Sequence, residues 1–190
     1  MAIKLAILAL LLEKDMHPYE MRTIMKERSL DRNAKIQIGS LYYAVEQLSK
    51  HGFIEATQVI KSTNRPDKTV YCITDTGKAK FEAMLLSMIE EIEPVYHSIN
   101  MALAFAWKAD QQRIAVVLHK RVIEAEHQVN LLFEIYQEHI GVVPRSVLHL
   151  MAGNYEHAKT ELRILKKLYQ DASEGRLSEV SNESVLDEEE

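Results

Sequence analysis

Residues 38–54, with the sequence IGSLYYAVEQLSKHGFI, constrain the fold of this chain more than any other segment. At about 100° per residue, the apolar positions of this segment gather on one side of a helix. Those positions are Leu41, Ala44, Val45 and Leu48. Gly52 is a typical helix terminator, and the residues after it favour a strand. The segment therefore predicts a short amphipathic helix, about Gly39–His51, that leads directly into a β-strand.

The flanking residues predict the other elements of a small domain. Pro18 can begin a helix because its missing N–H is not needed there, and Thr74 or Asp75 can cap another. The expected elements are a nearly all-apolar helix over Ile3–Lys14, a helix to Arg28, a turn over Ser29–Lys35, strands over Phe53–Ile60 and Val70–Thr74, and a helix through Ile89. This order is that of a winged helix-turn-helix, with residues 61–68 as the wing.

The second half of the chain shows helical periodicity and no strand pattern. Gly141–Pro144 is expected to be a turn between two helices. The last helix carries apolar residues at alternating steps of three and four, which is a heptad pattern. The proposed dimerisation residues on this seam are Leu148, Met151, Tyr155, Leu162, Leu165 and Tyr169. Such a stripe can also pack inside its own chain, and both alternatives stay open.

Composition agrees with a mainly α protein that has one small β-hairpin. The 190 residues include only 6 glycines and 4 prolines, and 47% of them are hydrophobic. Residues 1–87 carry a net charge of +3 and residues 88–190 one of −8, so the basic excess lies in the predicted winged helix. We expect a DNA-binding domain over 1–91, a helical dimerisation and effector domain over 92–172, and an acidic, disordered tail over 173–190.

The exposed start of the helix over Gly39–His51 is the first candidate DNA-contacting element. Small residues such as Gly39 and Ser40 allow close approach to a groove, and the hydroxyls of Tyr42 and Tyr43 can meet phosphates or base edges. The basic wing residues form the second candidate: Lys61, Arg65 and Lys68. The alternative is an ordinary surface helix beside a solvated loop.

Other functional classes find little support. The chain has no G-x-S-x-G elbow, P-loop or dinucleotide fingerprint, so we expect no enzymatic activity and no cofactor. The single cysteine, Cys72, fits a strand interior and a reducing cytoplasm, and the scattered histidines predict no metal site. The apolar stretch Ala2–Leu12 is too short for a bilayer, which needs about 20 residues. A signal peptide is the alternative for it, but charged residues follow at once over Glu13–Asp15.

At these positions the chain resembles the PadR family of bacterial transcription regulators. The matching segments are Ile3–Leu11, His17–Glu20, Gly39–Tyr42 with Leu48, Gly52–Ile54, Arg65-Pro66, and Tyr71–Thr74 with Gly77. The resemblance implies a homodimeric winged-helix repressor that is released from double-stranded DNA when a small effector binds or conditions change. A homodimer would present two recognition helices about 34 Å apart, which suits a palindromic operator. The resemblance also implies that Tyr19 contacts DNA, beside Ser40, Tyr42 and the wing. Lys35, in the turn before the helix, completes the predicted DNA-binding set.

The resemblance does not specify the effector, for which a small apolar or phenolic molecule is expected. Met101, Phe105 and Trp107 are the candidate lining of an effector pocket near the junction of the two halves. The alternative for Trp107 is a position in the core or in a dimer interface. The rival hypothesis to a DNA-binding regulator is a winged helix that binds a protein, with the acidic tail guiding docking. Neither hypothesis includes a membrane as a partner.

Overall fold

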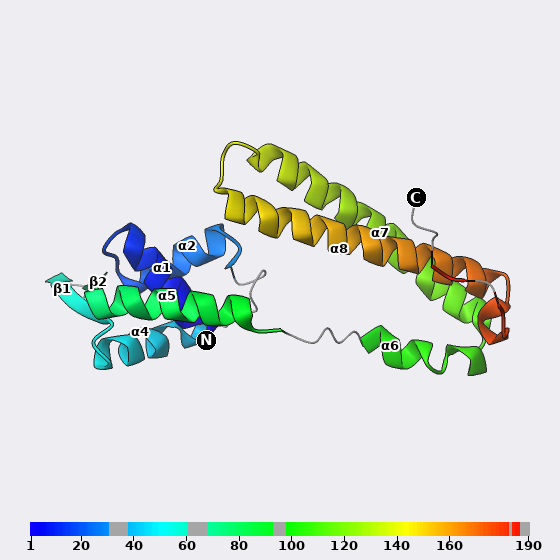
Figure 1. Ribbon diagram of the computed structural model, residues 1–190, viewed down its shortest axis with the longest axis horizontal. Helices are drawn as coiled ribbons and strands as arrows, with labels where there is room; N and C mark the ends of the chain where they lie inside the picture. The colour runs from blue at the N-terminus through cyan, green and yellow to red at the C-terminus, as the bar shows by residue number, and fades with distance from the viewer. Residues whose placement is uncertain (31–37, 61–67, 93–97, 183, 187–190) are drawn as a thin grey trace. The chain divides into compact units, whose positions relative to one another are not determined.

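The computed structural model describes residues 1–30, 38–60, 68–92, 98–182 and 184–186 of the chain (Figure 1). The chain divides into two compact units, Met1–Pro94 and Val95–Glu190, here called the N-terminal and C-terminal units. The described structure is mainly helical with one antiparallel β-hairpin, which confirms the predicted fold class. Among the described residues, none of the helices combines the length and hydrophobicity that crossing a bilayer requires.

The N-terminal unit contains the elements expected for a winged helix. In chain order they are α1 (Ala2–Glu13), α2 (Pro18–Glu27), the 3-10 turn η1 (Ile38–Ser40), α4 (Leu41–Lys50), β1 (Ile54–Ile60), β2 (Lys68–Ile73) and α5 (Asp75–Glu90). Both predicted capping features are present. Pro18 begins α2 behind the N-cap His17, and the Thr74 hydroxyl accepts a hydrogen bond from the Gly77 N–H at the start of α5.

The core of this unit forms around α1. Ile7 and Leu8 are fully buried, and α2, α4, α5 and the hairpin supply the side chains around them. The predicted buried face of α4 is confirmed, since its four apolar residues are at most 3% exposed. Although α1 is nearly all apolar, it leaves Leu12 exposed, because the core covers only part of its circumference.

The two strands pair antiparallel, from Ile54 opposite Ile73 to Ile60 opposite Lys68. An irregularity in the register follows Ala56. The second strand begins at Lys68, opposite Ile60, which is two residues before the predicted start. Met16, between α1 and α2, exchanges two backbone hydrogen bonds of 3.1 Å with Tyr71. This bridge ties the start of α2 to the hairpin.

The C-terminal unit is built on two long helices that run antiparallel side by side (Figure 1). Its elements are α6 (Ser98–Leu103), the 3-10 turn η2 (Ala106–Lys108), α7 (Gln111–His139), α8 (Arg145–Ser173) and the 3-10 turn η3 (Arg176–Ser178). The core between α7 and α8 contains Ala115, Leu118, Val122, Leu165 and Ala172. Ion pairs flank it, including Arg121 with Glu161 at 2.9 Å.

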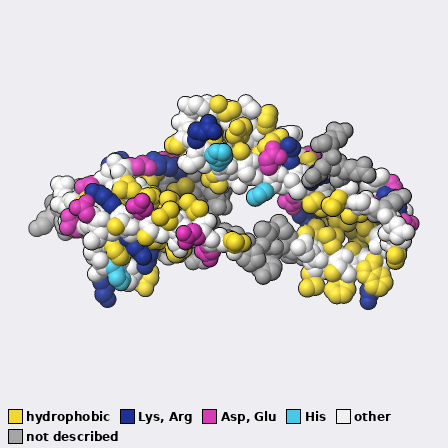
Figure 2. All heavy atoms as spheres, in the orientation of Figure 1, with side chains coloured by type: hydrophobic (Ala, Val, Ile, Leu, Met, Phe, Trp, Pro, Cys, Tyr) yellow, Lys and Arg dark blue, Asp and Glu magenta, His cyan; other side chains and the backbone are white. Residues whose placement is uncertain are grey.

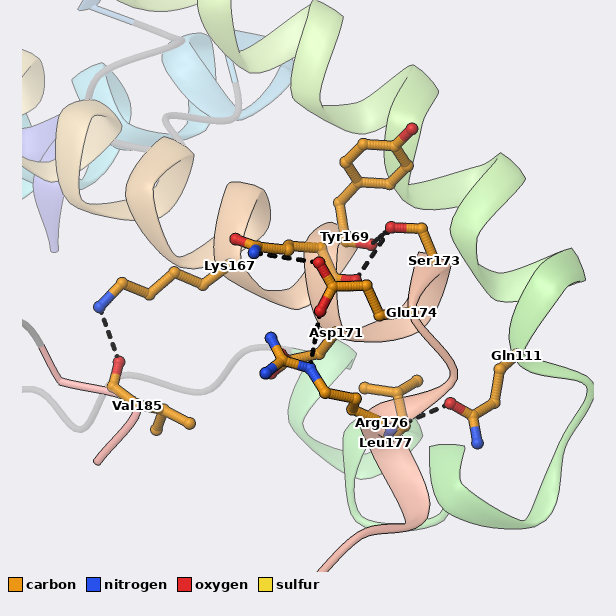
Figure 3. A network of polar contacts seen from close by, with 10 residues as sticks. Gln111, Lys167, Tyr169, Asp171, Ser173, Glu174, Arg176, Leu177 and Val185 are labelled. Atoms are coloured by element: carbon orange, nitrogen blue, oxygen red, sulfur yellow. Dashed lines mark hydrogen bonds and ion pairs between the residues drawn. The ribbon is translucent and has the colours of Figure 1, made fainter. Parts of the chain in front are cut away.

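The residues after α8 return to the start of α7, which differs from the disorder expected from Ser173 onward. The Gln111 side chain accepts a hydrogen bond of 2.9 Å from the Leu177 N–H and donates one of 3.2 Å to the Ser178 hydroxyl. Leu177 itself packs on the α7–α8 core. Arg176 forms ion pairs with acids at the end of α8 (Figure 3). Acidic composition therefore fails to predict disorder for residues 173–178, because one apolar side chain and several polar contacts hold them.

Candidate nucleic-acid interface

The tyrosines of the first turn of α4 point away from the core. Leu41, Ala44 and their neighbours on the buried face anchor the helix, so Tyr42 and Tyr43 lie on the opposite side and are 54% and 64% exposed. Neither ring is needed to fill the core. The alternative that both tyrosines pack on a neighbouring element therefore finds no support in the described residues, and two aromatic hydroxyls remain accessible to a ligand.

The start of α4 is open as well as exposed. A Cβ atom placed on Gly39 would have no atom of the described structure within 4 Å, so packing alone does not require glycine there. Ser40 is the N-cap of α4, but its side chain makes no capping hydrogen bond to the helix. A helix N-terminus of this kind presents N–H groups that can receive a phosphate oxygen.

Tyr19 is the third exposed tyrosine of this unit. It is the second residue of α2, its side chain is 62% exposed, and its N–H donates a 3.0 Å hydrogen bond to His17 Nδ1. Two ion pairs hold the adjoining chain. They join Arg28 to Glu13 and Lys14 to Glu20. The start of α2 is thus fixed by local contacts while its tyrosine stays accessible.

A shallow hollow of about 400 Å³ runs along α4 beside the start of α2. Its rim on α4 carries Tyr42, Glu46 and Lys50, which are spaced by four residues and all exposed. The remaining lining residues are Pro18, Val45, Ser49 and Tyr71. Glu46 and Lys50 were not among the DNA-contacting residues predicted from the sequence. The spacing of four residues from Tyr42 to Glu46 and from Glu46 to Lys50 predicts that the three side chains lie on one side of the helix.

Four basic residues belong to the predicted interface, and the described structure contains one of them. Lys35, Lys61 and Arg65 lie outside the described residues. For Lys68 the structure shows the backbone paired with Ile60 at the start of β2. Their roles in DNA binding remain predictions from the sequence.

Cys72 offers little nucleophilic reactivity. It lies on β2, is only partly buried, and its Sγ donates a 3.7 Å hydrogen bond to Glu55 Oε1. Burial, and next the negative charges of Asp15 and Glu55, raise the pKa of the thiol above its ordinary value. A raised pKa disfavours the thiolate that nucleophilic chemistry requires.

The predicted seam of α8 packs, at its C-terminal end, inside its own chain. Leu165 is 2% exposed, and Leu162 and Tyr169 pack against the same α7–α8 core. Tyr155 lies against Phe133 of α7, with ring centroids 5.4 Å apart. Leu148 and Met151, nearer the start of α8, are of intermediate exposure. For Leu162, Leu165 and Tyr169, the intramolecular alternative is the one that the structure shows.

The three residues of the predicted effector pocket form an exposed apolar patch. Met101, Phe105 and Trp107 are 69%, 57% and 53% exposed, so Trp107 is not a core residue of its own unit. In the space-filling view, hydrophobic side chains gather over the part of this unit that contains α6 and η2 (Figure 2). Val116 and Ile123, two turns apart on α7, are also more than half exposed.

An N-terminal unit of this order, with an exposed helix followed by a two-stranded hairpin, is a winged helix-turn-helix domain. The model of the transcriptional regulator PadR-like family matches residues 7–83. This match confirms, over those residues, the resemblance inferred from the motifs, and the matched family is one of transcriptional regulators rather than of enzymes. No curated protein sequence matches the chain.

Solved structures extend the likeness over both units as a likeness of fold. Bacillus subtilis PadR in complex with operator DNA has 18% identity and a TM-score of 0.75, covering 90% of this chain and 99% of that chain. The same protein in complex with p-coumaric acid has 17% identity and a TM-score of 0.72, covering 91% and 99%. The Vibrio cholerae virulence activator AphA has 14% identity and a TM-score of 0.65, covering 90% and 98%.

Proposed function

We propose that this protein is a sequence-specific DNA-binding repressor that acts as a cytoplasmic homodimer and is released by a small effector. The observation that carries the DNA-binding part is the exposed pair Tyr42 and Tyr43 at the open start of α4. In a winged helix this position is the one that enters the major groove. The complex of Bacillus subtilis PadR with operator DNA supports the same use of a similar fold.

The C-terminal unit supports the homodimer. Exposed large apolar side chains can mark an interaction surface, and Val116 and Ile123, two turns apart on α7, are 61% and 54% exposed. A second copy would cover these side chains, and the homodimer would bring two copies of α4 to the two half-sites of a palindrome, which lie about 34 Å apart. The predicted seam would contribute through Leu148 and Met151, which the α7–α8 core leaves partly exposed.

The proposed effector is an apolar or phenolic molecule that binds at the exposed patch of Met101, Phe105 and Trp107. The complex of Bacillus subtilis PadR with p-coumaric acid makes that compound the natural first probe. Addition of the acid should lower the affinity for DNA, and Trp107 fluorescence should change as the acid binds. If neither the DNA affinity nor the fluorescence changes, p-coumaric acid is not the effector. The DNA-binding proposal is tested separately by the titration described next.

The deciding experiment is a gel-shift titration with the DNA upstream of the protein's own gene, at several salt concentrations, beside a shuffled duplex of equal length. Phosphate contacts release counterions, so the affinity should fall steeply between 50 and 200 mM salt, by about a thousandfold for six or more contacts. Arg65→Ala should weaken binding to both duplexes, whereas Ser40→Ala should change the preference between them. Lys120→Ala, an exposed position on α7, is the control.

The rival hypothesis predicts a different outcome. A winged helix that binds a protein would leave DNA unshifted at every salt concentration and would be recovered in a stable heteromeric complex. That result, or equal binding to both duplexes, would overturn the proposal. Transcription in vitro from a bound promoter then tests the sign of regulation, because a repressor reduces the transcript and an activator raises it.

A further inference from the structure

Glu46 is an acid at the centre of the surface that α4 offers to DNA. It lies one helical turn beyond Tyr42 and one turn before Lys50, and all three side chains are exposed. At 1.5 Å rise per residue, each step is about 6 Å along the helix. The three side chains therefore form a row of hydroxyl, carboxylate and ammonium along one line of the outer face.

Glu46 is not neutralised within the described part of the chain. Lys50 is at the spacing that suits an ion pair, yet the ion pairs and hydrogen bonds of the described residues leave out Glu46. Two other exposed acids of this unit do have such partners, since Glu13 pairs with Arg28 and Glu20 with Lys14. Within the described structure the Glu46 carboxylate is therefore available to a partner that binds at α4.

The negative charge of Glu46 limits which groups of the DNA its carboxylate can contact. Phosphates repel it, so it weakens the sequence-independent part of DNA binding. Base edges in the major groove offer it hydrogen-bond donors, and the N4 amino group of cytosine is the one that Glu accepts from most readily. Thymine at the same place presents the O4 acceptor, which would lie against the carboxylate without a proton between them.

We propose that Glu46 determines specificity by accepting a hydrogen bond from cytosine N4 at one position of each operator half-site. Lys50, at the last turn of α4, lies beside it and binds the flanking phosphate. Tyr42 occupies the neighbouring position toward the helix start. This inference rests on the proposed function, because it needs α4 in the major groove.

The test is a selection from a randomised 30-base-pair duplex library with the full-length protein, followed by titration of the enriched duplex and its single-base variants. The wild type should enrich one cytosine per half-site, and exchange of that cytosine for thymine should weaken binding about 5- to 150-fold. Glu46→Gln should shift the preference at that position to adenine, because glutamine pairs with adenine N6 and N7. Glu46→Ala should accept all four bases there.

Glu82→Gln is the matched control, since Glu82 is an exposed acid on α5 and its replacement removes the same charge. It should bind with the wild-type preference at every position. Enrichment of the same motif by the wild type, Glu46→Gln and Glu46→Ala would overturn the role of Glu46 and leave the DNA-binding proposal intact. Enrichment of no motif by the wild type would overturn both.

Discussion

The Cα atom of Gly77 lies so close to the backbone of Phe53 that a Cβ atom added to it would be 2.0 Å from the Phe53 carbonyl oxygen. The same oxygen accepts a 3.1 Å hydrogen bond from the Thr74 N–H. The hydroxyls of Thr74 and Thr76 donate to the carbonyl of Gly52 at 2.7 and 2.9 Å. These contacts hold the start of α5 against the turn that ends α4. The orientation of α4 therefore depends on the close approach of Gly77 to Phe53.

Gly77→Ala should destabilise the N-terminal unit by about 3 kcal/mol, because the methyl group meets backbone that cannot move as a side chain would. Urea denaturation followed by circular dichroism measures the loss in the free energy of unfolding. Gly153→Ala is the control, since a Cβ atom there meets nothing within 4 Å in the middle of α8. That change should stabilise the protein by about 0.5–1 kcal/mol. Equal effects of the two changes would refute the packing argument.

Neighbouring residues on α8 should differ sharply in their contribution to stability. Leu165 is 2% exposed in the α7–α8 core and Ile164 is 53% exposed. Leu165→Ala should lower the free energy of unfolding by about 2–5 kcal/mol, because it leaves a cavity. Ile164→Ala should change it by less than about 0.5 kcal/mol. Urea denaturation followed by the fluorescence of Trp107 reports on this unit. A larger loss for Ile164→Ala would mean that the helix faces α7 with its other side.

The ion pair between Glu13 and Arg28 should give a small, pH-dependent stabilisation. Two hydrogen bonds of 2.5 and 2.7 Å join them, and those bonds with Arg28 lower the pKa of the Glu13 carboxyl. A carboxyl with a lowered pKa in the folded state stabilises the protein above its unfolded pKa, and this contribution disappears as the pH falls through the folded value. Both side chains are about half exposed, so we expect about 0.5 kcal/mol or less at pH 7.

Glu13→Gln tests this expectation. Its free energy of unfolding should lie below that of the wild type at pH 7 and approach it as the pH falls through the lowered pKa of the folded-state carboxyl, where the wild-type side chain also becomes neutral. Glu82→Gln, at an exposed site on α5, should show no comparable convergence. A difference for Glu13→Gln that stays constant from pH 7 to pH 3 would contradict the linkage.

Local periodicity predicted the elements of the N-terminal unit well. The buried face of α4 follows from the spacing of Leu41, Ala44, Val45 and Leu48, because a helix turns by a nearly constant angle per residue. The cap at Thr74 follows from a hydroxyl at a helix start in the same way. These features depend on residues within one or two turns of one another.

Contacts between distant segments could not be predicted in this way. The bridge from Met16 to Tyr71 and the approach of Gly77 to Phe53 depend on how whole elements pack. An apolar stripe such as the one through Leu165 shows that something must cover it, but its own chain and a second copy satisfy the same pattern. The acidic residues around Leu177 favoured a disordered tail, so the sequence did not predict the contact of Leu177 with the α7–α8 core.

The turn after α8 should depend on Gln111. Its side-chain oxygen receives the Leu177 N–H and its amide donates to Ser178. Gln111→Ala should cost about 1 kcal/mol for the lost hydrogen bonds and should speed hydrogen exchange at the Leu177 amide. Gln128→Ala, at an exposed position on the same helix, should leave that amide unchanged. Rapid exchange at Leu177 in the wild-type protein would show that the turn is not held.

The hydroxyls of Tyr42 and Tyr43 should contribute to DNA affinity and hardly to stability. Both rings are more than half exposed, so replacement by phenylalanine removes no buried partner. If each hydroxyl donates one hydrogen bond to DNA, Tyr42→Phe and Tyr43→Phe should each weaken binding about 3- to 10-fold, with an unchanged free energy of unfolding. Fluorescence anisotropy with a labelled duplex from the upstream region measures this. Tyr136→Phe, at a half-buried position on α7 in the C-terminal unit, should bind like the wild type. Wild-type affinity in both α4 variants would exclude these hydroxyls from the interface and leave the start of the helix backbone as the remaining phosphate ligand.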